Sequence, residues 1–147
     1  MQITSRVTIG VHMLCAIEYF KEEKITSAFL AASVGANPVI VRMVMSSLRD
    51  AGLIKVSQGK TGITLAKPLA DITLFDVYNA VENEESGIFN FHDNPNPNCP
   101  VGRNIHSALD DKLEKVQLAM ENEMGAIHLD SVYLGIVNKE NNHEQSR

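Results

Sequence analysis

The amino-acid sequence predicts a mainly α-helical (α+β) fold: a winged helix-turn-helix with a two-stranded wing and a long C-terminal helix. Two short helical segments joined by a glycine-containing turn precede two β-prone runs that flank a polar loop. A long amphipathic repeat follows beyond residue 100. The chain has 147 residues, 44% of them hydrophobic, which indicates one domain of ordinary size, or a small domain with a compact appendage, and argues against wholesale disorder.

Two helices are predicted before residue 34. Residues 6–20 carry apolar side chains at spacings of three and four, the period of a helix that buries one face. A shorter helix is expected over 26–33, with Thr26 as its N-cap. Gly35 then permits a sharp exit, because glycine tolerates a positive φ.

A third helix is predicted over 38–51, and its start is strongly marked. Asn37 can cap this helix, and Pro38 costs nothing at the first helical position, where its missing N–H would have no helical partner. Gly52 is expected to end the helix. Two short helices separated by a tight turn are typical of a helix-turn-helix.

The wing is predicted from two short β-prone runs, 53–56 and 63–65. Between them, residues 57–62 form a polar loop with two glycines, which is typical of a β-hairpin with a flexible tip. A further helix is expected over 71–82. The order of helix, helix-turn-helix and hairpin predicts a winged-helix DNA-binding domain over residues 1–82.

The rest of the chain is predicted to divide into three parts. Residues 83–100 form a loop that ends in an Asn-Pro run and is a candidate sensor segment. Residues 101–137 form dimerisation helices, a long one from about Pro100 and a short one over 130–137. Residues 138–147 are expected to be a disordered polar tail.

The long helix carries an apolar stripe that predicts dimerisation. Its members recur every three or four residues: Ile105, Leu109, Leu113, Val116, Met120, Met124 and Ile127. Such a stripe exceeds what one small winged domain can cover, so a helix of a second copy is expected to pack on it. The alternative is that the helices at 71–82 and 130–137 cover the stripe within the chain.

Charge is distributed unevenly along the chain. Residues 1–67 carry eight Lys and Arg against four Asp and Glu, a net charge of +4, whereas the other 80 residues carry −9. A basic half joined to an acidic half is expected when one half faces phosphate and the other does not. The alternative is ordinary scatter of surface charge.

Candidate DNA-contacting residues lie on the third helix and at the hairpin. The second helix of a helix-turn-helix enters the major groove N-terminus first. Arg42 can contact guanine or phosphate, and Asn37 can reach adenine or a phosphate oxygen. Arg49 is expected to meet the DNA backbone or an acidic neighbour. The hairpin-tip residues can enter the minor groove or contact phosphate. The full set is Asn37, Val39, Arg42, Arg49, Gln58, Lys60 and Thr61, and for each the alternative is a solvated surface residue.

Four segments together resemble a known family. These are the segments 37–42, 48–54, 58–65 and 71–77, and they resemble the Rrf-type (Rrf-two) family of bacterial winged-helix transcriptional regulators. The resemblance covers nearly all of the chain except the tail. It implies a dimeric transcription factor, usually a repressor, that binds a partly palindromic operator in double-stranded DNA.

The resemblance raises the question of an iron–sulfur cluster. Well-known members of the family hold one through three cysteines in the loop before the long helix. Here that loop offers only Cys99, while Cys15 lies in the first helix. A cluster needs about four thiolate or imidazole ligands, and His92 and His106 would still leave the site short. No cofactor and no metal are therefore expected.

Cys99 is the candidate redox sensor. It immediately precedes Pro100 at the start of the long helix, where the helix dipole and free N–H groups stabilise a thiolate. Arg103 and His106 can add positive charge, and oxidation to sulfenic acid or a disulfide would shift the helix. The alternative is a plain surface cysteine. Cys15 is expected to be a small core residue.

Membrane, export and enzymatic classes are not favoured. The N-terminus lacks the pattern of a secretory signal, and the longest charge-free apolar stretch, residues 25–41, is too short and broken to span a bilayer. A cytoplasmic location is expected. Gly59, Lys60 and Thr61 copy the end of a phosphate-binding loop, but Ile54 stands where its first glycine is needed.

The sequence thus predicts a non-enzymatic, sequence-specific DNA-binding regulator, a homodimeric repressor with thiol-redox control through Cys99. Two alternatives stay open. A small ligand or partner protein controls the same DNA-binding scaffold, or the winged helix is a protein-interaction module whose basic face binds an acidic partner without DNA.

Overall fold

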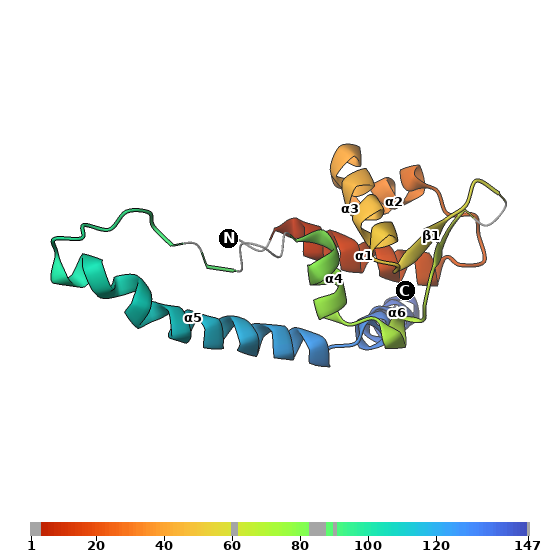
Figure 1. Cartoon of the computed structure of the whole chain (residues 1–147). Coiled ribbons are helices and arrows are strands. Elements are labelled where there is room, and N and C mark those ends of the chain that lie inside the picture. The colour runs from red at the N-terminus through yellow and green to blue at the C-terminus, as the bar shows by residue number, and fades with distance from the viewer. Residues whose placement is uncertain (1–3, 60–61, 83–87, 90, 147) are drawn as a thin grey trace.

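A computed structural model describes residues 4–59, 62–82, 88–89 and 91–146 (Figure 1). It confirms the mainly α-helical fold with a two-stranded wing and a long helix near the C-terminus. The elements run in the order α1 (Ser5–Tyr19), α2 (Ser27–Val34), α3 (Pro38–Asp50), β1 (Ile54–Val56), β2 (Ile63–Leu65), the 3-10 helix η1 (Leu69–Asp71), α4 (Leu74–Val81), α5 (Pro100–Ala126) and α6 (Leu129–Gln145).

Local side-chain caps fix the helix-turn-helix. The Thr26 hydroxyl accepts a hydrogen bond from the backbone N–H of Phe29, and Asn37 Oδ1 accepts one from Val39 N–H at 2.8 Å. Gly35 ends α2 with φ of 71°, a left-handed conformation that favours glycine. The predicted caps are therefore confirmed, and they hold α2 and α3 on either side of a tight turn.

The wing is an antiparallel pair in which Lys55 lies opposite Thr64. At the loop end of the strand pair, the backbone N–H of Ile63 donates to the carbonyl of Ile25, in the segment between α1 and α2, over 3.0 Å. The strand pair confirms the predicted hairpin. Its tip, Lys60 and Thr61, lies outside the described residues.

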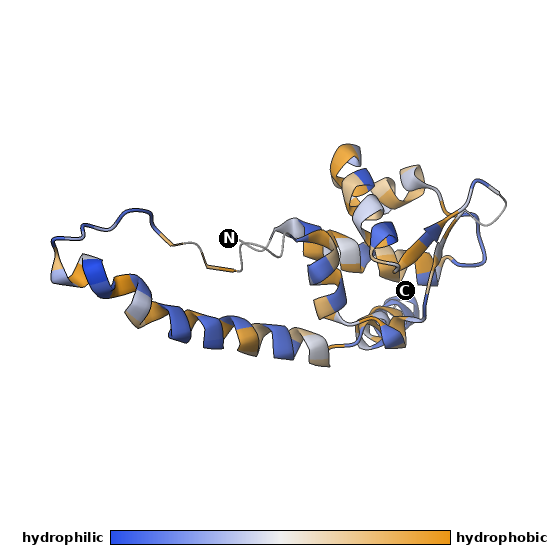
Figure 2. Cartoon of the chain, in the orientation of Figure 1, coloured by the Kyte–Doolittle hydropathy of each residue, from blue (hydrophilic) through white to orange (hydrophobic). Residues whose placement is uncertain are grey.

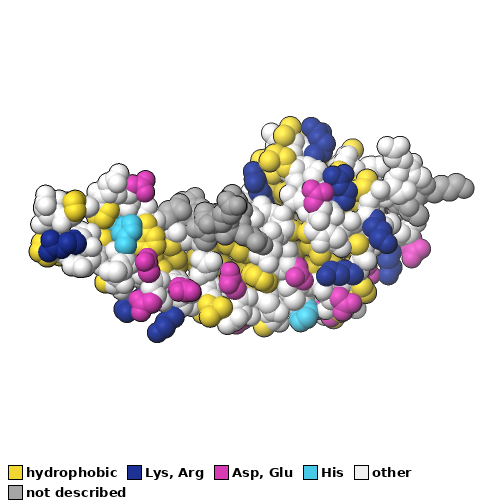
Figure 3. Space-filling model, in the orientation of Figure 1, with side chains coloured by type: hydrophobic (Ala, Val, Ile, Leu, Met, Phe, Trp, Pro, Cys, Tyr) yellow, Lys and Arg dark blue, Asp and Glu magenta, His cyan; other side chains and the backbone are white. Residues whose placement is uncertain are grey.

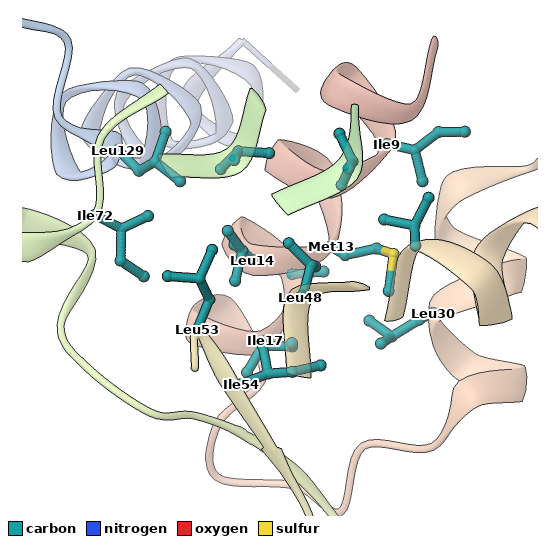
Figure 4. Packing of buried hydrophobic residues seen from close by; sticks show 14 of the residues in the cluster. Ile9, Met13, Leu14, Ile17, Leu30, Leu48, Leu53, Ile54, Ile72 and Leu129 are labelled. Atoms are coloured by element: carbon teal, nitrogen blue, oxygen red, sulfur yellow. The ribbon is translucent and has the colours of Figure 1, made fainter. Parts of the chain in front are cut away.

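The hydrophobic core is built around α1, which packs against α2, α3, α4, β2 and α6. Met13, Leu14 and Ile17 of α1 are fully buried and meet core residues from the other elements (Figure 4). Gly10 allows a close approach of α4, because a Cβ at this position would lie 2.8 Å from Cγ1 of Val77. This core positions α3 with one face outward.

The predicted disordered tail over 138–147 is wrong for residues 138–145. Instead of a short helix at 130–137, α6 continues without a break to Gln145. Polar composition suggested a tail, but the chain has no Pro or Gly after Gly135 to end the helix. Leu129, which is fully buried in the core, anchors the first turn of α6.

The helix predicted over 71–82 is also corrected at its start. The structure has η1 first, and α4 begins only at Leu74. Thr73 caps α4 with its side chain, while the Asp76 carboxylate accepts from the Thr73 N–H in a reciprocal capping box. The cap places Thr73 outside the helix and separates α4 from η1.

The long helix α5 begins at Pro100, as predicted, and runs past the winged domain. Met120 and Met124, toward its C-terminal end, pack against the core. Its N-terminal half extends away from the other helices, and apolar and polar residues alternate along it (Figure 2). The intrachain alternative for the apolar stripe therefore holds only for its C-terminal part.

Main-chain hydrogen bonds tie the corner between α5 and α6 to the winged domain. Leu74 N–H donates to the carbonyl of Ile127 at 2.8 Å, and Leu129 N–H donates to the carbonyl of Ile72 at 2.9 Å. His128 Nδ1 also lies 2.8 Å from the carbonyl oxygen of Ala70. The α5–α6 corner is thus bonded to the segment that joins η1 and α4.

In the part of the chain that the structure describes, no single helix has both the length and the apolar character needed to cross a membrane. Among the described helices, the pair α2 and α3 meets those two criteria when taken together, and the two are bent by 116° relative to each other.

Candidate nucleic-acid interface

The helix α3 has one face in the core and one face open to solvent. Val41, Val44 and Leu48 are buried, whereas the positions between them in the first two turns are exposed. Figure 3 shows Lys and Arg side chains interspersed with hydrophobic ones over the helix-turn-helix. The open face of α3, presented by a rigid core, has the geometry of a recognition helix.

Three apolar side chains are exposed on this face. They are Val39 (53% exposed), Ile40 (36%) and Met43 (46%). Val39 was predicted from the sequence and the other two were not, because an apolar residue within a helical pattern suggests core. The available signal was the register: Val41, Val44 and Leu48 already fill the buried face, so neighbouring apolar residues must point outward. Apolar side chains in a major groove contact thymine methyl groups.

The polar candidates at α3 differ in which side-chain groups remain available to bind DNA. The Arg42 side chain is exposed and forms no ion pair within the described residues. Asn37 uses Oδ1 as the helix cap, which occupies one of the two acceptor sites of that oxygen and leaves the amide NH₂ as a donor. Arg49 Nε lies 3.5 Å from Asp50 Oδ1, which matches the acidic-neighbour alternative.

The wing contributes exposed polar side chains beside α3. Gln58 is exposed at the hairpin, and Lys55 on β1 is exposed as well. Lys55 was not among the sequence-based candidates, since a basic residue within a strand carries no local signal of its target. Lys60 and Thr61, both predicted to contact DNA, fall in the part of the hairpin that the structure does not describe.

Cys99 occupies the N-cap position of α5, as predicted. The thiol is partly exposed, and the backbone N–H groups of Gly102 and Val101 lower its pKa. The predicted charge support is absent from these causes: Arg103 Nη1 donates to the carbonyl of Pro97 at 3.4 Å. The helix N-terminus itself therefore stabilises the thiolate.

His106 contacts the main chain of the loop rather than supporting Cys99. His106 Nε2 lies 3.2 Å from the carbonyl oxygen of His92, and the His106 ring packs on Phe91 with centroids 4.6 Å apart. Cys15 is buried in α1, as predicted, and burial raises the pKa of its thiol to about 11. The two cysteines are thus in opposite environments, one favouring the thiolate and one the neutral thiol.

A helix-turn-helix with an outward second helix, followed by a two-stranded hairpin on the same domain, defines the winged-helix class of DNA-binding proteins. Comparison with known proteins identifies the family. The chain belongs to the Rrf2 family, described as iron-dependent transcriptional regulators, whose family model matches residues 3–134. It is accordingly a transcriptional regulator and not an enzyme, and the resemblance noted in the sequence is confirmed.

Individual relatives agree with this assignment. The chain is 44% identical over 130 residues to YwnA of Bacillus subtilis, named as an HTH-type transcriptional regulator, covering 88% of this chain and 96% of the relative. A crystal structure described as that of a DNA-binding protein matches with a TM-score of 0.71 and 40% identity, covering 87% of this chain and 98% of that one. IscR of T. potens shares the fold, with a TM-score of 0.68 at 20% identity over 92% of this chain and 88% of its own.

Proposed function

We propose that this regulator is a homodimeric repressor that binds a specific operator in double-stranded DNA through α3 and the wing. The observation that carries the proposal is the outward face of α3, on which Arg42 stands among Val39, Ile40 and Met43. In the major groove, the guanidinium pairs with guanine or phosphate while the apolar side chains contact base edges. The family resemblance supports repression.

The charge distribution supports a polyanionic partner, for which we propose DNA. The net charge of +4 lies in residues 1–67, which hold the helix-turn-helix and the wing. Lys55 lies on β1, which packs against α3, and Gln58 is exposed in the hairpin loop, so both are available to the DNA backbone flanking the major groove. Binding to phosphate weakens steeply with salt because counterions are released, and this dependence separates DNA binding from docking to an acidic protein.

The proposed dimer uses α5. No residue of this helix is fully buried within the chain, although it spans 27 residues. Val101 is 70% exposed, and Leu109 and Leu113 are partly exposed without belonging to the packed core. A second copy of α5 would cover these side chains, and a two-fold axis would match a palindromic operator.

Redox control through Cys99 is the proposed signal input. The thiolate attacks a hydroperoxide, forming an S–O bond as the O–O bond breaks. The sulfur is oxidised to sulfenic acid, and the peroxide is reduced to water or alcohol. Support comes from the partial exposure and lowered pKa of the Cys99 thiol at the start of the proposed dimer helix. We also place the protein in the reducing cytoplasm, where this thiol starts reduced.

We further propose that the protein works without a resident iron–sulfur cluster, although the family is described as iron-dependent. The whole sequence holds two cysteines, and Cys15 is buried in α1 rather than in the loop. Beside Cys99, His106 already lies within hydrogen-bond distance of the main chain of His92. One thiol and two imidazoles do not fit a cluster that needs about four ligands.

The proposal is tested by recovering bound genomic fragments and titrating the best one in gel-shift assays. The Arg42→Ala variant is expected to lose at least tenfold in operator affinity, because it removes a guanine or phosphate contact. Arg103→Ala, on α5, removes the same charge away from the wing and is the matched control. Equal affinity of both variants, or no fragment enriched, would contradict operator binding through α3.

A further inference from the structure

A cavity of about 740 Å³ opens between α1, α2 and α6. Most of its wall comes from α1, while Ser33 contributes from α2 and Ile136 and Glu140 from α6. No residue of α3 lines it, so the cavity is separate from the face assigned to DNA. Its volume is in the range of sites that enclose small organic ligands.

The wall of the cavity is largely apolar and aromatic. Val11 and Ala16 form part of it, and Tyr19 and Phe20 meet edge to face with ring centroids 4.9 Å apart. The Cys15 thiol also lines it, and burial raises its pKa to about 11, so the sulfur stays neutral. A ligand that fills this space needs an apolar body.

Among the described residues, Glu140 is the only Asp or Glu that lines the cavity. Its side chain is partly buried, and among the described residues none forms an ion pair or hydrogen bond with its carboxylate. Lys21 is already paired with Glu18 at 3.0 Å. Two other polar groups of the wall are satisfied, since His12 Nε2 and Ser33 Oγ lie 2.9 Å apart. A partly buried carboxylate beside an apolar wall is stabilised by a cation that reaches it.

We propose that this cavity binds a lipophilic organic cation, an amine or quaternary ammonium on an aromatic or aliphatic body. The apolar body packs against Val11, Ala16 and Phe20, and the cationic group faces the Glu140 carboxylate. The exposed ring of Tyr19 adds a cation–π surface. Organic anions of the same shape are rejected by the carboxylate. The site goes beyond the proposed DNA binding and does not require it.

Two dyes built on one xanthene ring test the charge preference. The full-length protein is titrated into rhodamine 6G, a lipophilic cation, and into fluorescein, an anion, and fluorescence polarisation is followed without DNA. Rhodamine 6G is expected to bind saturably at one site per chain, and fluorescein is expected to show no saturable binding.

Three variants locate the site. Glu140→Gln removes the charge at nearly constant shape and is expected to weaken rhodamine 6G binding at least tenfold. Glu144→Gln makes the same change one turn further along α6, where the residue is exposed and lines no part of the cavity, and is expected to bind like the wild type. Val11→Trp, with folding checked by circular dichroism, fills the cavity and is expected to abolish binding.

Two results would overturn the proposal of a cation site. One is the absence of saturable rhodamine 6G binding to the wild type, and the other is equal affinity of the Glu140→Gln and Glu144→Gln variants for the dye. Undiminished binding by a folded Val11→Trp protein would place the dye elsewhere and reject this cavity. None of these results bears on operator binding, which the gel-shift assays test separately.

Discussion

Gly62 and Ile25 form an isolated parallel β-bridge that joins the loop end of the wing to the segment between α1 and α2. Gly62 has φ of 64°, and a Cβ there would collide with the carbonyl of Ile25. The neighbouring Ile63 N–H donates to that same carbonyl at 3.0 Å. The wing is thus held to the helical domain by main-chain contact that only glycine permits.

Replacement of this glycine is therefore expected to destabilise the protein. Gly62→Ala should lower the free energy of unfolding by about 2 kcal/mol or more, because a strained φ and a backbone collision add together. The control is Gly59→Ala, whose new Cβ would meet only Ser57 Oγ at 3.4 Å and which should change stability by less than about 0.5 kcal/mol. Urea denaturation measures both, and equal midpoints would contradict the expectation.

Thymine methyl groups are expected to contribute to operator recognition. Val39, Ile40 and Met43 offer apolar surface where hydrogen-bonding side chains would otherwise read bases. Replacing thymine by deoxyuracil at a contacted position should weaken binding about fourfold, since burying one methyl-sized group contributes about 0.8 kcal/mol. The Met43→Ala variant should bind operators with thymine or deoxyuracil equally well at the position that Met43 contacts. The same replacement outside the half-sites is the control, and unchanged affinity throughout would argue against apolar readout by α3.

The two thiols are expected to differ in reactivity. The lowered pKa of Cys99 means that, at any pH below that pKa, more of its thiol is ionised than in free cysteine. Its alkylation by iodoacetamide should therefore rise with pH and level off at a lower pH than for N-acetylcysteine. Cys15, buried and with its pKa raised to about 11, should stay unlabelled at neutral pH.

Mass spectrometry of the peptides measures this difference in labelling. Urea-unfolded protein provides the control, because both thiols should then react at similar rates. Faster native labelling of Cys15 than of Cys99 would refute the assignment.

A charge placed on the apolar stripe of α5 is expected to dissociate the proposed dimer. Leu109→Glu should raise the dimer dissociation constant about 100-fold, corresponding to about 3 kcal/mol for an unpaired carboxylate in an apolar interface. Ala108→Glu adds the same charge at the adjacent exposed position and should have little effect. Sedimentation equilibrium measures both variants. A wild-type protein that stays monomeric at all concentrations would contradict the dimer itself.

The elements that local chemistry determines could be predicted from the sequence. Thr26, Gly35 and Asn37 act through neighbours within a few residues, so α2 and α3 could be delimited from the sequence. The last turns of α6 could not, because a helix that is polar on all sides has no periodic signal. Nor could the cavity be foreseen, since His12 and Glu140 are brought together only by tertiary packing.

Part of the candidate DNA interface could also be predicted, because it depends on local sequence. Asn37 and Arg42 follow from the start and period of one helix. That the capping bond occupies one of the two acceptor sites of Asn37 Oδ1 could be learned only from the coordinates. Ile40 and Met43 required knowledge of which apolar positions the core had already filled.

The two hydrogen bonds that join the α5–α6 corner to residues 72 and 74 have a mechanical consequence. They join the long helix directly to the domain that carries α3, without a flexible linker. A movement of α5 is therefore expected to move that domain with it. If two copies pair through α5, a small rotation at the pairing seam is transmitted to both recognition helices and changes the distance between them. A signal at the N-terminal end of α5 would then change the spacing of the two recognition helices, so that it no longer matches the helical repeat of DNA.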